Sequence, residues 1–390
     1  MADRPSTAFV LRSAGAILAR VDESGPVLPT GSADEASRPT RFASVGETVR
    51  AVRSGDPITI DGKRIQPVLY DVEHRRTIPT GYAWIQPSRL FEGPGDWWQA
   101  YRAVAPTVDT IENDSEHGAS YLSYRALEVL RDRAAERAHG CAGITELRSV
   151  AESLVVCRPS MGVIATRVDR VMAVTDSGQK PVAVEQAAIA CLFNALVADQ
   201  LVATRGSSIV VGHRVMTLSR SDTVSMALDT GGASIVAVLE SRPGGEGTST
   251  AQRLATHTDV SLWPDSAVAH VIETTPVDLL IVGADSVLRD GSVVNKVGTR
   301  SAAAAAAACD VPVYVLSSRD KVSVTNEPHL EQLEPIWIET DCDPIRFERP
   351  LFDHTPATLV TGIVTETGII DPADIEPIAA EHEVRAHWRS

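Results

Sequence analysis

The sequence has no uninterrupted apolar run of about 18 residues, the length that a helix needs to cross a membrane. The first thirty residues also lack the apolar core of a secretory signal, because charged side chains interrupt them. These side chains are Asp3, Arg4, Arg12, Arg20, Asp22 and Glu23. From both absences we expect no membrane span and a cytoplasmic location.

Positive charge is scarce as well. The formal net charge is −15, and only four of the 36 basic residues are lysines, namely Lys63, Lys180, Lys296 and Lys321. A general nucleic-acid-binding protein needs a basic surface, so this class is disfavoured and no direct nucleic-acid partner is expected. Against this background Lys296, which lies in a predicted turn, draws attention, although a solvated surface lysine is the plain alternative.

The five cysteines lie far apart in the sequence, and none belongs to a CxxC pair. They are Cys141, Cys157, Cys191, Cys309 and Cys342. An odd number without paired spacing argues against a disulfide framework and against a zinc site. We therefore expect most of them to be small core residues and predict no bound metal.

A length of 390 residues predicts two or three domains. We divide the chain into a β-rich N-terminal domain (1–95), a helical subdomain (96–205) and a C-terminal domain (206–390). In the first domain, alternating apolar residues predict strands, and the turn-rich stretch Gly25–Pro39 predicts a loop. The predicted strands are Thr7–Leu11 and Ala16–Ala19, which form a hairpin, then Pro57–Ile60, Gln66–Tyr70 and Tyr82–Ile85.

Apolar residues recur at helical spacing over 119–138, 144–157 and 184–202, which predicts packed helices. From residue 206, continuous apolar strands alternate with helical stretches, which predicts an α/β fold with a Rossmann-like, doubly wound parallel sheet. The predicted strands are Ile209–Val211 with Val215–Thr217, Ser234–Glu240, Val260–Trp263, Leu279–Gly283 and Val311–Leu316. No GxGxxG motif follows the first of them, so neither a dinucleotide nor another cofactor is predicted.

Polar residues follow four of these strands, and parallel strands end at the same edge of a sheet. We therefore expect Ser219, Glu240, Asp265 and Asp285 to share one edge. Positive charge from Arg242 and Lys296, and close backbone approach at Gly244, Gly245 and Gly247, are predicted for the same edge. An anionic small molecule is the ligand that this combination predicts.

The most informative motif is Ile281-Val-Gly-Ala-Asp285, followed ten residues on by Asn295-Lys-Val-Gly-Thr299. A carboxylate at a strand end suits proton transfer or hydroxyl binding. A helix that begins at Thr299 with free N–H groups, beside Lys296, suits a phosphate. A plain βα turn with a helix cap is the alternative.

These motifs, together with Phe352-Asp-His-Thr-Pro356, resemble the superfamily of initiation factor 2B regulatory subunits, methylthioribose-1-phosphate isomerase and ribose-1,5-bisphosphate isomerase. The resemblance covers roughly residues 110–370. It implies that Asp285 is the catalytic aspartate and that Ser219 stands where the isomerases have a catalytic cysteine. A thiol can be tuned toward neutrality, whereas a serine hydroxyl needs a neighbouring base to act comparably.

The resemblance also implies a set of phosphosugar-binding residues. These are Gly118, Ala119, Arg158, Arg242, Gly247, Asn295 and Lys296. The sequence departs from the isomerases at His117, where they have an arginine, and at Glu246, where they have a glutamine. Plainer interpretations remain open, with His117 as a surface histidine, Ser219 as a helix N-cap and the two arginines as ion-paired scaffold residues.

The second half of the N-terminal domain resembles a Nudix domain, in Asp61-Gly-Lys-Arg-Ile-Gln-Pro-Val-Leu-Tyr-Asp71 and Tyr82-Ala-Trp-Ile-Gln-Pro87. The metal-binding helix of that family has no counterpart, because residues 42–54 contain only one glutamate, Glu47. A magnesium site needs several carboxylates, so we predict no hydrolysis of nucleoside diphosphates. A degenerate binding or docking module and a β-module without a ligand both remain open.

Three functions follow from these patterns. The first is a regulatory protein related to initiation factor 2B subunits that binds a phosphorylated sugar or nucleotide, with catalysis reduced or lost. The second is an aldose–ketose isomerase for a phosphosugar of the ribose 1,5-bisphosphate or methylthioribose 1-phosphate type. A Nudix hydrolase ranks third. The resemblance further implies a homodimer or larger homo-oligomer, with a translation initiation factor as a candidate partner.

Overall fold

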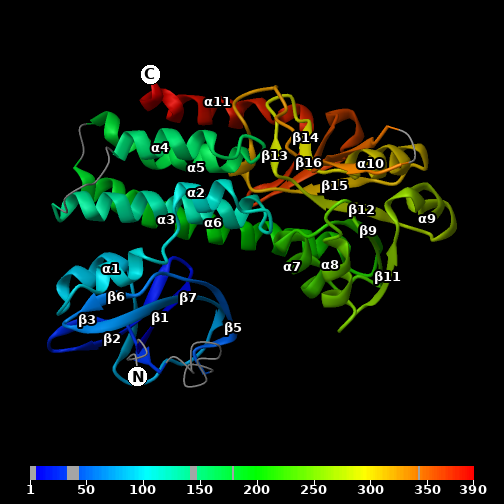
Figure 1. Cartoon of the computed structure of the whole chain (residues 1–390). Helices are drawn as coiled ribbons and strands as arrows, with labels where there is room; N and C mark the ends of the chain where they lie inside the picture. Colours follow the sequence, from blue (N-terminus) through cyan, green and yellow to red (C-terminus); the bar gives the residue numbers. More distant parts are fainter. Residues whose placement is uncertain (1–5, 33–43, 141–146, 178–179, 341–342) are drawn as a thin grey trace. The chain divides into compact units, whose positions relative to one another are not determined.

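The computed structural model describes residues 6–32, 44–140, 147–177, 180–340 and 343–390 (Figure 1). Cys141, Cys342 and residues 33–39 of the predicted loop lie outside them. The chain forms two compact units, of which the first comprises residues 1–113, 124–151 and 177–193 and the second 114–123, 152–176 and 194–390. Helices α3 (Ala119–Ala138) and α6 (Pro181–Val210) contribute to both. The division at residues 95 and 205 stays a prediction.

The first unit contains a mixed sheet in the order β3-β2-β1-β7-β5, with β4 paired to β1, β6 to β7 and β8 to β2. Its strands are β1 (Ser6–Ser13), β2 (Ala16–Asp22), β3 (Gly25–Val27), β4 (Thr30–Gly31), β5 (Gly46–Ser54), β6 (Ile58–Ile60), β7 (Lys63–Arg75) and β8 (Tyr82–Ile85). The predicted hairpin is confirmed by the antiparallel pairing of β1 with β2. The loop predicted over Gly25–Pro39 is wrong at β3 and β4, because sheet pairing overrides the turn-rich composition there.

Strand β5 lies in the stretch where a Nudix domain would have its metal-binding helix. The long strand β7 pairs parallel with β1 and antiparallel with β5. Alternate residues of β1 point to opposite faces of the sheet and pack in two different apolar clusters. Ala8 and Val10 belong to one cluster, and Phe9 and Leu11 belong to the other. The β-rich character of this region is confirmed, while the likeness to a Nudix domain stays a prediction.

A buried ion cluster in the first unit connects α3 with α1 (Trp97–Arg102). The other short helices of this unit are η3 (Pro87–Glu92) and α2 (Val108–Glu112). Arg131 of α3 is 2 % exposed, and its three nitrogens donate to Asp132 (2.9 Å), the Tyr101 hydroxyl (2.8 Å) and the Gly15 carbonyl. Asp132 also accepts from Tyr101 at 2.7 Å and from Arg102 at 3.1 Å. Every nitrogen of this buried guanidinium therefore has an acceptor.

Three predicted helices are present as α3, α4 (Leu147–Val156) and α6, whereas the sequence pattern does not predict α5 (Gly162–Met172) or the short η4 (Ala173–Ser177). Helix α6 continues to Val210, so the strand predicted at Ile209–Val211 is wrong. Val210 packs in an apolar cluster with residues of α7 and α8 (bounds given below). A short apolar run fits a buried helix end as well as a strand, which explains the error.

Helix α6 is also long and apolar enough to cross a membrane by composition. An 18-residue window has a mean hydropathy of 1.6, and 44 % of that window is buried. The core helix of a soluble protein meets the same criterion, so length and hydropathy alone do not identify a span here.

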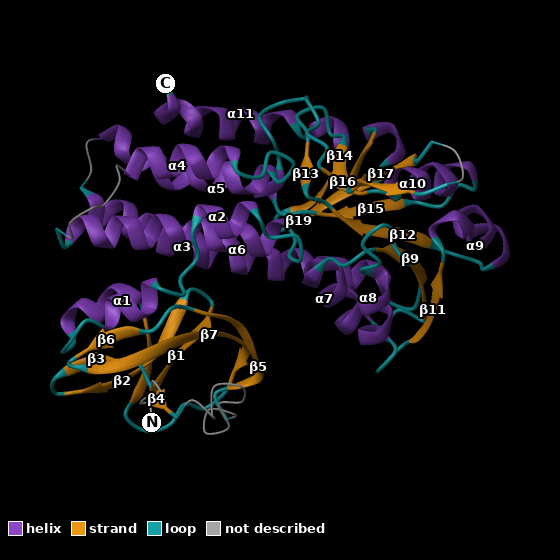
Figure 2. Cartoon of the chain, viewed as in Figure 1, coloured by secondary structure: helices purple, strands orange, loops and turns teal. Residues whose placement is uncertain are grey.

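The second unit is built on a sheet in the order β11-β10-β9-β12-β15-β19-β20 (Figure 2). Its strands are β9 (Arg214–Leu218), β10 (Ile235–Leu239), β11 (Asp259–Trp263), β12 (Leu279–Gly283), β15 (Val313–Leu316), β19 (Gly362–Thr365) and β20 (Gly368–Ile370). All neighbours pair parallel except β19 with β20. The strand order reverses between β9 and β12, which is the topological switch point of a doubly wound sheet. The predicted parallel α/β fold is confirmed.

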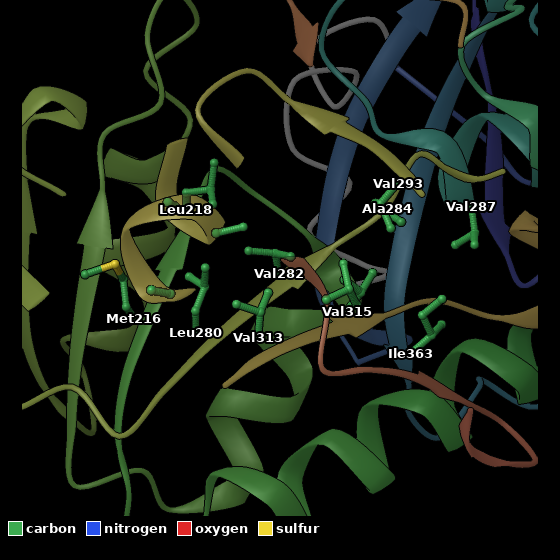
Figure 3. Close-up of a cluster of buried hydrophobic side chains, with 14 of the residues drawn as sticks. Met216, Leu218, Leu280, Val282, Ala284, Val287, Val293, Val313, Val315 and Ile363 are labelled. Carbon is green, nitrogen blue, oxygen red and sulfur yellow. The ribbon is translucent and has the colours of Figure 1, made fainter. Parts of the chain in front are cut away.

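Apolar side chains cover both faces of this sheet. Met216 and Leu280 enter a cluster with residues of α9 and α10 (Figure 3), whereas their neighbours Val215 and Ile281 enter one with residues of α7 and α8. The helices are α7 (Asp222–Gly231), α8 (Gly247–Leu254), η5 (Asp265–Ala267), α9 (Val268–Thr274), α10 (Thr299–Ala308) and α11 (Glu376–Arg385). Because both faces are buried, the strands are continuous apolar runs.

Smaller elements surround the carboxyl edge of the sheet. A three-stranded antiparallel sheet contains β13 (Ser286–Val287), β14 (Val293–Lys296) and β18 (Phe352–Thr355). A hairpin of β16 (Gln332–Ile338) and β17 (Ile345–Pro350) precedes β18. The other short helices are η6 (Arg319–Lys321), η7 (Ala357–Leu359), η8 (Pro372–Asp374) and η9 (Ala386–Arg389). The motif residues thus lie where these elements meet the large sheet.

Candidate functional site

The predicted polar residues follow successive parallel strands and therefore share the carboxyl edge of the sheet. Ser219 follows β9, Glu240 follows β10, Asp265 follows β11 and Asp285 follows β12. A fifth strand end, that of β15, leads to Lys321, which belongs to none of the motifs described above. The edge lies within the second unit.

Asp285 combines partial burial with several favourable contacts. Its backbone N–H donates to the Val294 carbonyl at 2.9 Å, which fixes it at the start of the small sheet. Burial raises the pKa of the Asp285 carboxyl above its ordinary value, and the charges of Lys321 and Lys296 and the backbone N–H of Ala119 oppose that rise. The N-terminus of α3, predicted at Gly118–Ala119 to bind substrate, thus meets this carboxylate.

Lys321 is 6 % exposed, and its Nζ donates to the carbonyl of Ala284 at 2.7 Å. Burial lowers the pKa of the Lys321 ammonium, and the charges of Asp199 and Asp285 oppose the shift. Lys321 therefore holds the residue that precedes Asp285 and supplies a charge of opposite sign. Two signals in the sequence could have identified it: the rarity of lysine and its position after a parallel strand.

Ser219 has a φ of 61°, in the left-handed region that non-glycine residues rarely adopt. Its carbonyl accepts a hydrogen bond from the Thr250 hydroxyl at 2.8 Å, which holds this backbone in place. The N-cap of α7 is Ser221, whose hydroxyl accepts from the Val224 N–H at 3.4 Å. The capping role considered for Ser219 thus belongs to its neighbour. Strained backbone of this kind clusters at functional sites.

Arg158 is bound by a glutamate from a distant part of the chain. Its guanidinium donates to both carboxylate oxygens of Glu331, at 2.9 to 3.2 Å, and to the Asp114 carbonyl at 2.6 Å. The Ser160 hydroxyl donates to the same carboxylate. This bidentate arrangement with an added hydroxyl is how proteins commonly bind an anion.

Arg242 and Lys296 each contact a glutamate too. Arg242 donates to Glu240 at 3.1 Å, and its side chain is 69 % exposed. Lys296 donates from Nζ to Glu246 Oε1 at 2.7 Å. The positive charge predicted for this edge is therefore matched, cation by cation, with carboxylates.

The phosphate site predicted at the start of α10 is already occupied by a carboxylate of the chain. Asp353 accepts from the N–H of Gly298 at 2.8 Å and from that of Arg300 at 3.1 Å. Asn295, predicted to bind substrate, donates its amide to the Thr299 hydroxyl at 3.0 Å. Two of the N–H groups predicted to be free for a phosphate are therefore bound by Asp353 of the neighbouring β18, which caps this helix.

Two further predicted residues have structural explanations. A Cβ on Gly247 would lie 2.0 Å from the Leu239 carbonyl, so close packing of α8 on β10 requires glycine there. His117 interacts with Asp114 at 2.8 Å and stacks on Tyr121 with ring centroids 4.0 Å apart. The side chain of His117 is 19 % exposed, and these contacts of His117 lie within the chain.

Residues 115–372 match the model of the initiation factor 2 subunit family. The chain belongs to this family. The methylthioribose-1-phosphate isomerase of Exiguobacterium sibiricum is 26 % identical over 344 residues, which cover 80 % of the chain and 96 % of that enzyme. The enzyme of the same name from Acaryochloris marina is 33 % identical over 133 residues, where the match spans only 38 % of the relative.

Solved structures agree with this membership. The translation initiation factor eIF-2B of Pyrococcus horikoshii OT3 has 25 % identity and a TM-score of 0.58, over 68 % of this chain and 95 % of that one. The 5-methylthioribose 1-phosphate isomerase of the same organism has 19 % identity and a TM-score of 0.55, over 71 % of this chain and 86 % of that one, and shows the shared fold. Family and fold therefore agree with the resemblance described from the motifs.

Proposed function

We propose that this chain is an aldose–ketose isomerase of sugar phosphates, with Asp285 as the group that moves a proton. The observation that carries the proposal is the environment of Asp285, a partly buried carboxyl with raised pKa between two lysines and the N-terminus of a helix. The relatives named methylthioribose-1-phosphate isomerase support it. The isomerase hypothesis, ranked second from the sequence, thereby moves ahead of the regulatory one.

The reaction opens the ring at the bond between C1 and the ring oxygen, removes a proton from C2 and adds one to C1, while the proton of the C2 hydroxyl passes to the ring oxygen. A carboxylate can accept the first proton and return one, and its efficiency is greatest when its pKa lies near the working pH. Burial moves the pKa of Asp285 in that direction. Lys321 and Lys296 limit the rise, so that the ionised form remains available as a base.

Ser219 takes the position of the second reacting group in this proposal. It follows β9, the strand next to β12 in the sheet, at the switch point where open α/β sheets bind ligands. A hydroxyl is a weaker acid than a thiol, so we expect slow turnover.

Arg158 and Lys296 bind the phosphorylated substrate in the proposal, and the ligand displaces Glu331 from Arg158.

The test is proton and phosphorus NMR of the purified full-length chain with methylthioribose 1-phosphate and, separately, with ribose 1,5-bisphosphate. The proposal predicts ketose signals that grow in proportion to protein concentration with at least one of the two. Absence of ketose from both, with circular dichroism that reports a folded protein, contradicts it.

A regulatory phosphosugar-binding protein is the second candidate. Ser219 favours it, because a hydroxyl at the position of the isomerase cysteine exchanges protons poorly near neutral pH. Binding in the same NMR samples, seen as line broadening without product, distinguishes this candidate from the isomerase.

We also propose a role in docking for the N-terminal β-rich domain and a homodimer or larger homo-oligomer for the whole chain, in the cytoplasm. A relative of known structure is a tetrameric eIF2B-beta2-delta2 complex from C. thermophilum, which supports the idea of assembly. A strand, β5, in place of the metal-binding helix supports docking over Nudix hydrolysis. Light scattering of the full chain tests the oligomer, and a single-chain mass contradicts it.

A further inference from the structure

Glu246 has one carboxylate oxygen without a donor. Its Oε1 accepts from Lys296, but its Oε2 is buried, and no donor in the described part of the chain reaches it. Buried polar atoms in native proteins nearly always have a partner. An ionised carboxylate only accepts, so any partner beyond Lys296 has to be a donor, such as a hydroxyl or a water molecule.

The loop that carries Glu246 is built around this carboxylate. A Cβ on Gly244 would lie 2.3 Å from Oε1 and 2.5 Å from Oε2, so the lack of a side chain on Gly244 leaves room for the carboxylate where it lies. The side chains of Glu246 and Lys296 are 21 % and 16 % exposed, which limits screening by water and strengthens their attraction. Lys296 also lies 5.4 Å from the ring of Phe352 on the neighbouring strand β18. The ion pair with Lys296 and the space beside Gly244 thus favour this position of the carboxylate.

A phosphate group does not suit this position. Its oxygens accept hydrogen bonds and carry negative charge, so a phosphate at Lys296 would lie against the Glu246 carboxylate and leave Oε2 without a donor. Like charges brought together in a partly dry site are strongly unfavourable. A sugar hydroxyl, in contrast, carries no charge and can donate to the Glu246 carboxylate while it accepts from Lys296.

The Arg158 region has the opposite character. There the guanidinium and the Ser160 hydroxyl converge on a single carboxylate, that of Glu331, which is 26 % exposed. Glu331 occupies the place that a phosphate would take, and it belongs to the segment ahead of the β16–β17 hairpin rather than to the sheet. One region therefore suits an anion and the other a hydroxyl.

We infer that Glu246 is a specificity-determining residue that makes the Lys296 region a hydroxyl-binding subsite, so that the substrate is a sugar with a single phosphate, bound at Arg158. The inference rests on the proposed function, because it concerns the ligand of the same site. It distinguishes between the two substrate types that the sequence leaves open.

The test is isothermal titration calorimetry of the full-length chain with ribose 1-phosphate and ribose 1,5-bisphosphate, which differ only in the second phosphate. The wild-type chain is expected to bind the monophosphate at least about tenfold more tightly. Glu246→Gln should abolish that preference by strengthening binding of the bisphosphate, and Glu246→Asp, which keeps the charge, should retain it. Glu273→Gln, an exposed change of the same net charge, should alter neither affinity.

Two results overturn the inference. The first is tighter binding of the bisphosphate by the wild-type chain. The second is a ratio of the two affinities that Glu246→Gln leaves unchanged. Ketose formation from either sugar alongside one of these results leaves the proposed function intact. If the folded chain binds neither probe and forms no ketose, both the inference and the proposed function fail.

Discussion

Two charged clusters of the molecule differ in how completely their polar atoms are paired. Around Arg131 in the first unit, every guanidinium nitrogen has an acceptor, and the Asp132 carboxylate accepts on both oxygens. At the carboxyl edge of the second unit, Glu246 leaves an acceptor unused, and Ser219 has left-handed backbone. Complete pairing of the Arg131 guanidinium fits a scaffold. An oxygen without a hydrogen-bond donor among the described residues occurs in the first unit as well, at Glu128, so the raised pKa of the Asp285 carboxyl is what marks the second cluster as a ligand site.

The largest expected effect comes from breaking the scaffold cluster. Arg131→Met removes the cation and leaves the buried Asp132 with fewer partners, so the free energy of unfolding should fall by roughly 3–5 kcal/mol. Urea denaturation monitored by circular dichroism measures it, with Arg137→Met, an exposed change in the same helix, as the control. Equal midpoints for the two variants contradict a structural role for the cluster.

A smaller effect is expected from Ser219→Cys. A thiol transfers protons near neutral pH more readily than a hydroxyl, so kcat for ketose formation should rise by about tenfold, within the usual range for acid–base groups. Ser219→Ala should lower kcat by a similar factor, and neither change should alter the melting temperature appreciably. A Ser219→Ala chain with unchanged kcat removes Ser219 from the reaction.

Lys321→Met should shift the pH dependence of kcat/KM and should have little effect on the rate at high pH. Burial raises the pKa of Asp285 and Lys321 opposes it, so loss of the lysine raises that pKa further. A base acts only when ionised, and its activity is lost as pH falls through its pKa; the acid limb of the kcat/KM profile should therefore move to higher pH. The exposed Lys180→Met is the control, and an unshifted profile in Lys321→Met assigns that lysine to folding alone.

Much of the fold follows from local patterns. Continuous apolar runs identify β10 and β12 because both faces of the sheet are buried, and α3 follows from helical spacing. The end of α6 at Val210 does not follow from a local pattern, because a short apolar run is too short to show whether its period is that of a helix or of a strand. The pairing of β3 with β2 and of β4 with β1 could not be predicted either, because this stretch is rich in turn residues.

The candidate site, like the fold, could be predicted only in part from the sequence. Ser219 and Asp285 could be placed at one edge because parallel topology alone brings strand ends together. The partners of the predicted cations could not be predicted from the sequence. Glu331 lies 173 residues from Arg158, and no periodic pattern connects the two. The capping of α10 by Asp353 depends on pairing of β14 with β18, which is likewise a tertiary contact.

The most direct test of the account is the rate of ketose formation by Asp285→Asn, measured by NMR beside Asp278→Asn. Both variants remove one carboxylate, but Asp278 is bound to Arg214 and lies at the opposite end of β12. The account predicts that Asp285→Asn lowers kcat by at least about 100-fold, as expected for loss of an acid–base group, while Asp278→Asn stays near the wild-type rate. An Asp285→Asn chain that forms ketose at the wild-type rate contradicts the assignment of Asp285 and, with it, the proposed function of this edge.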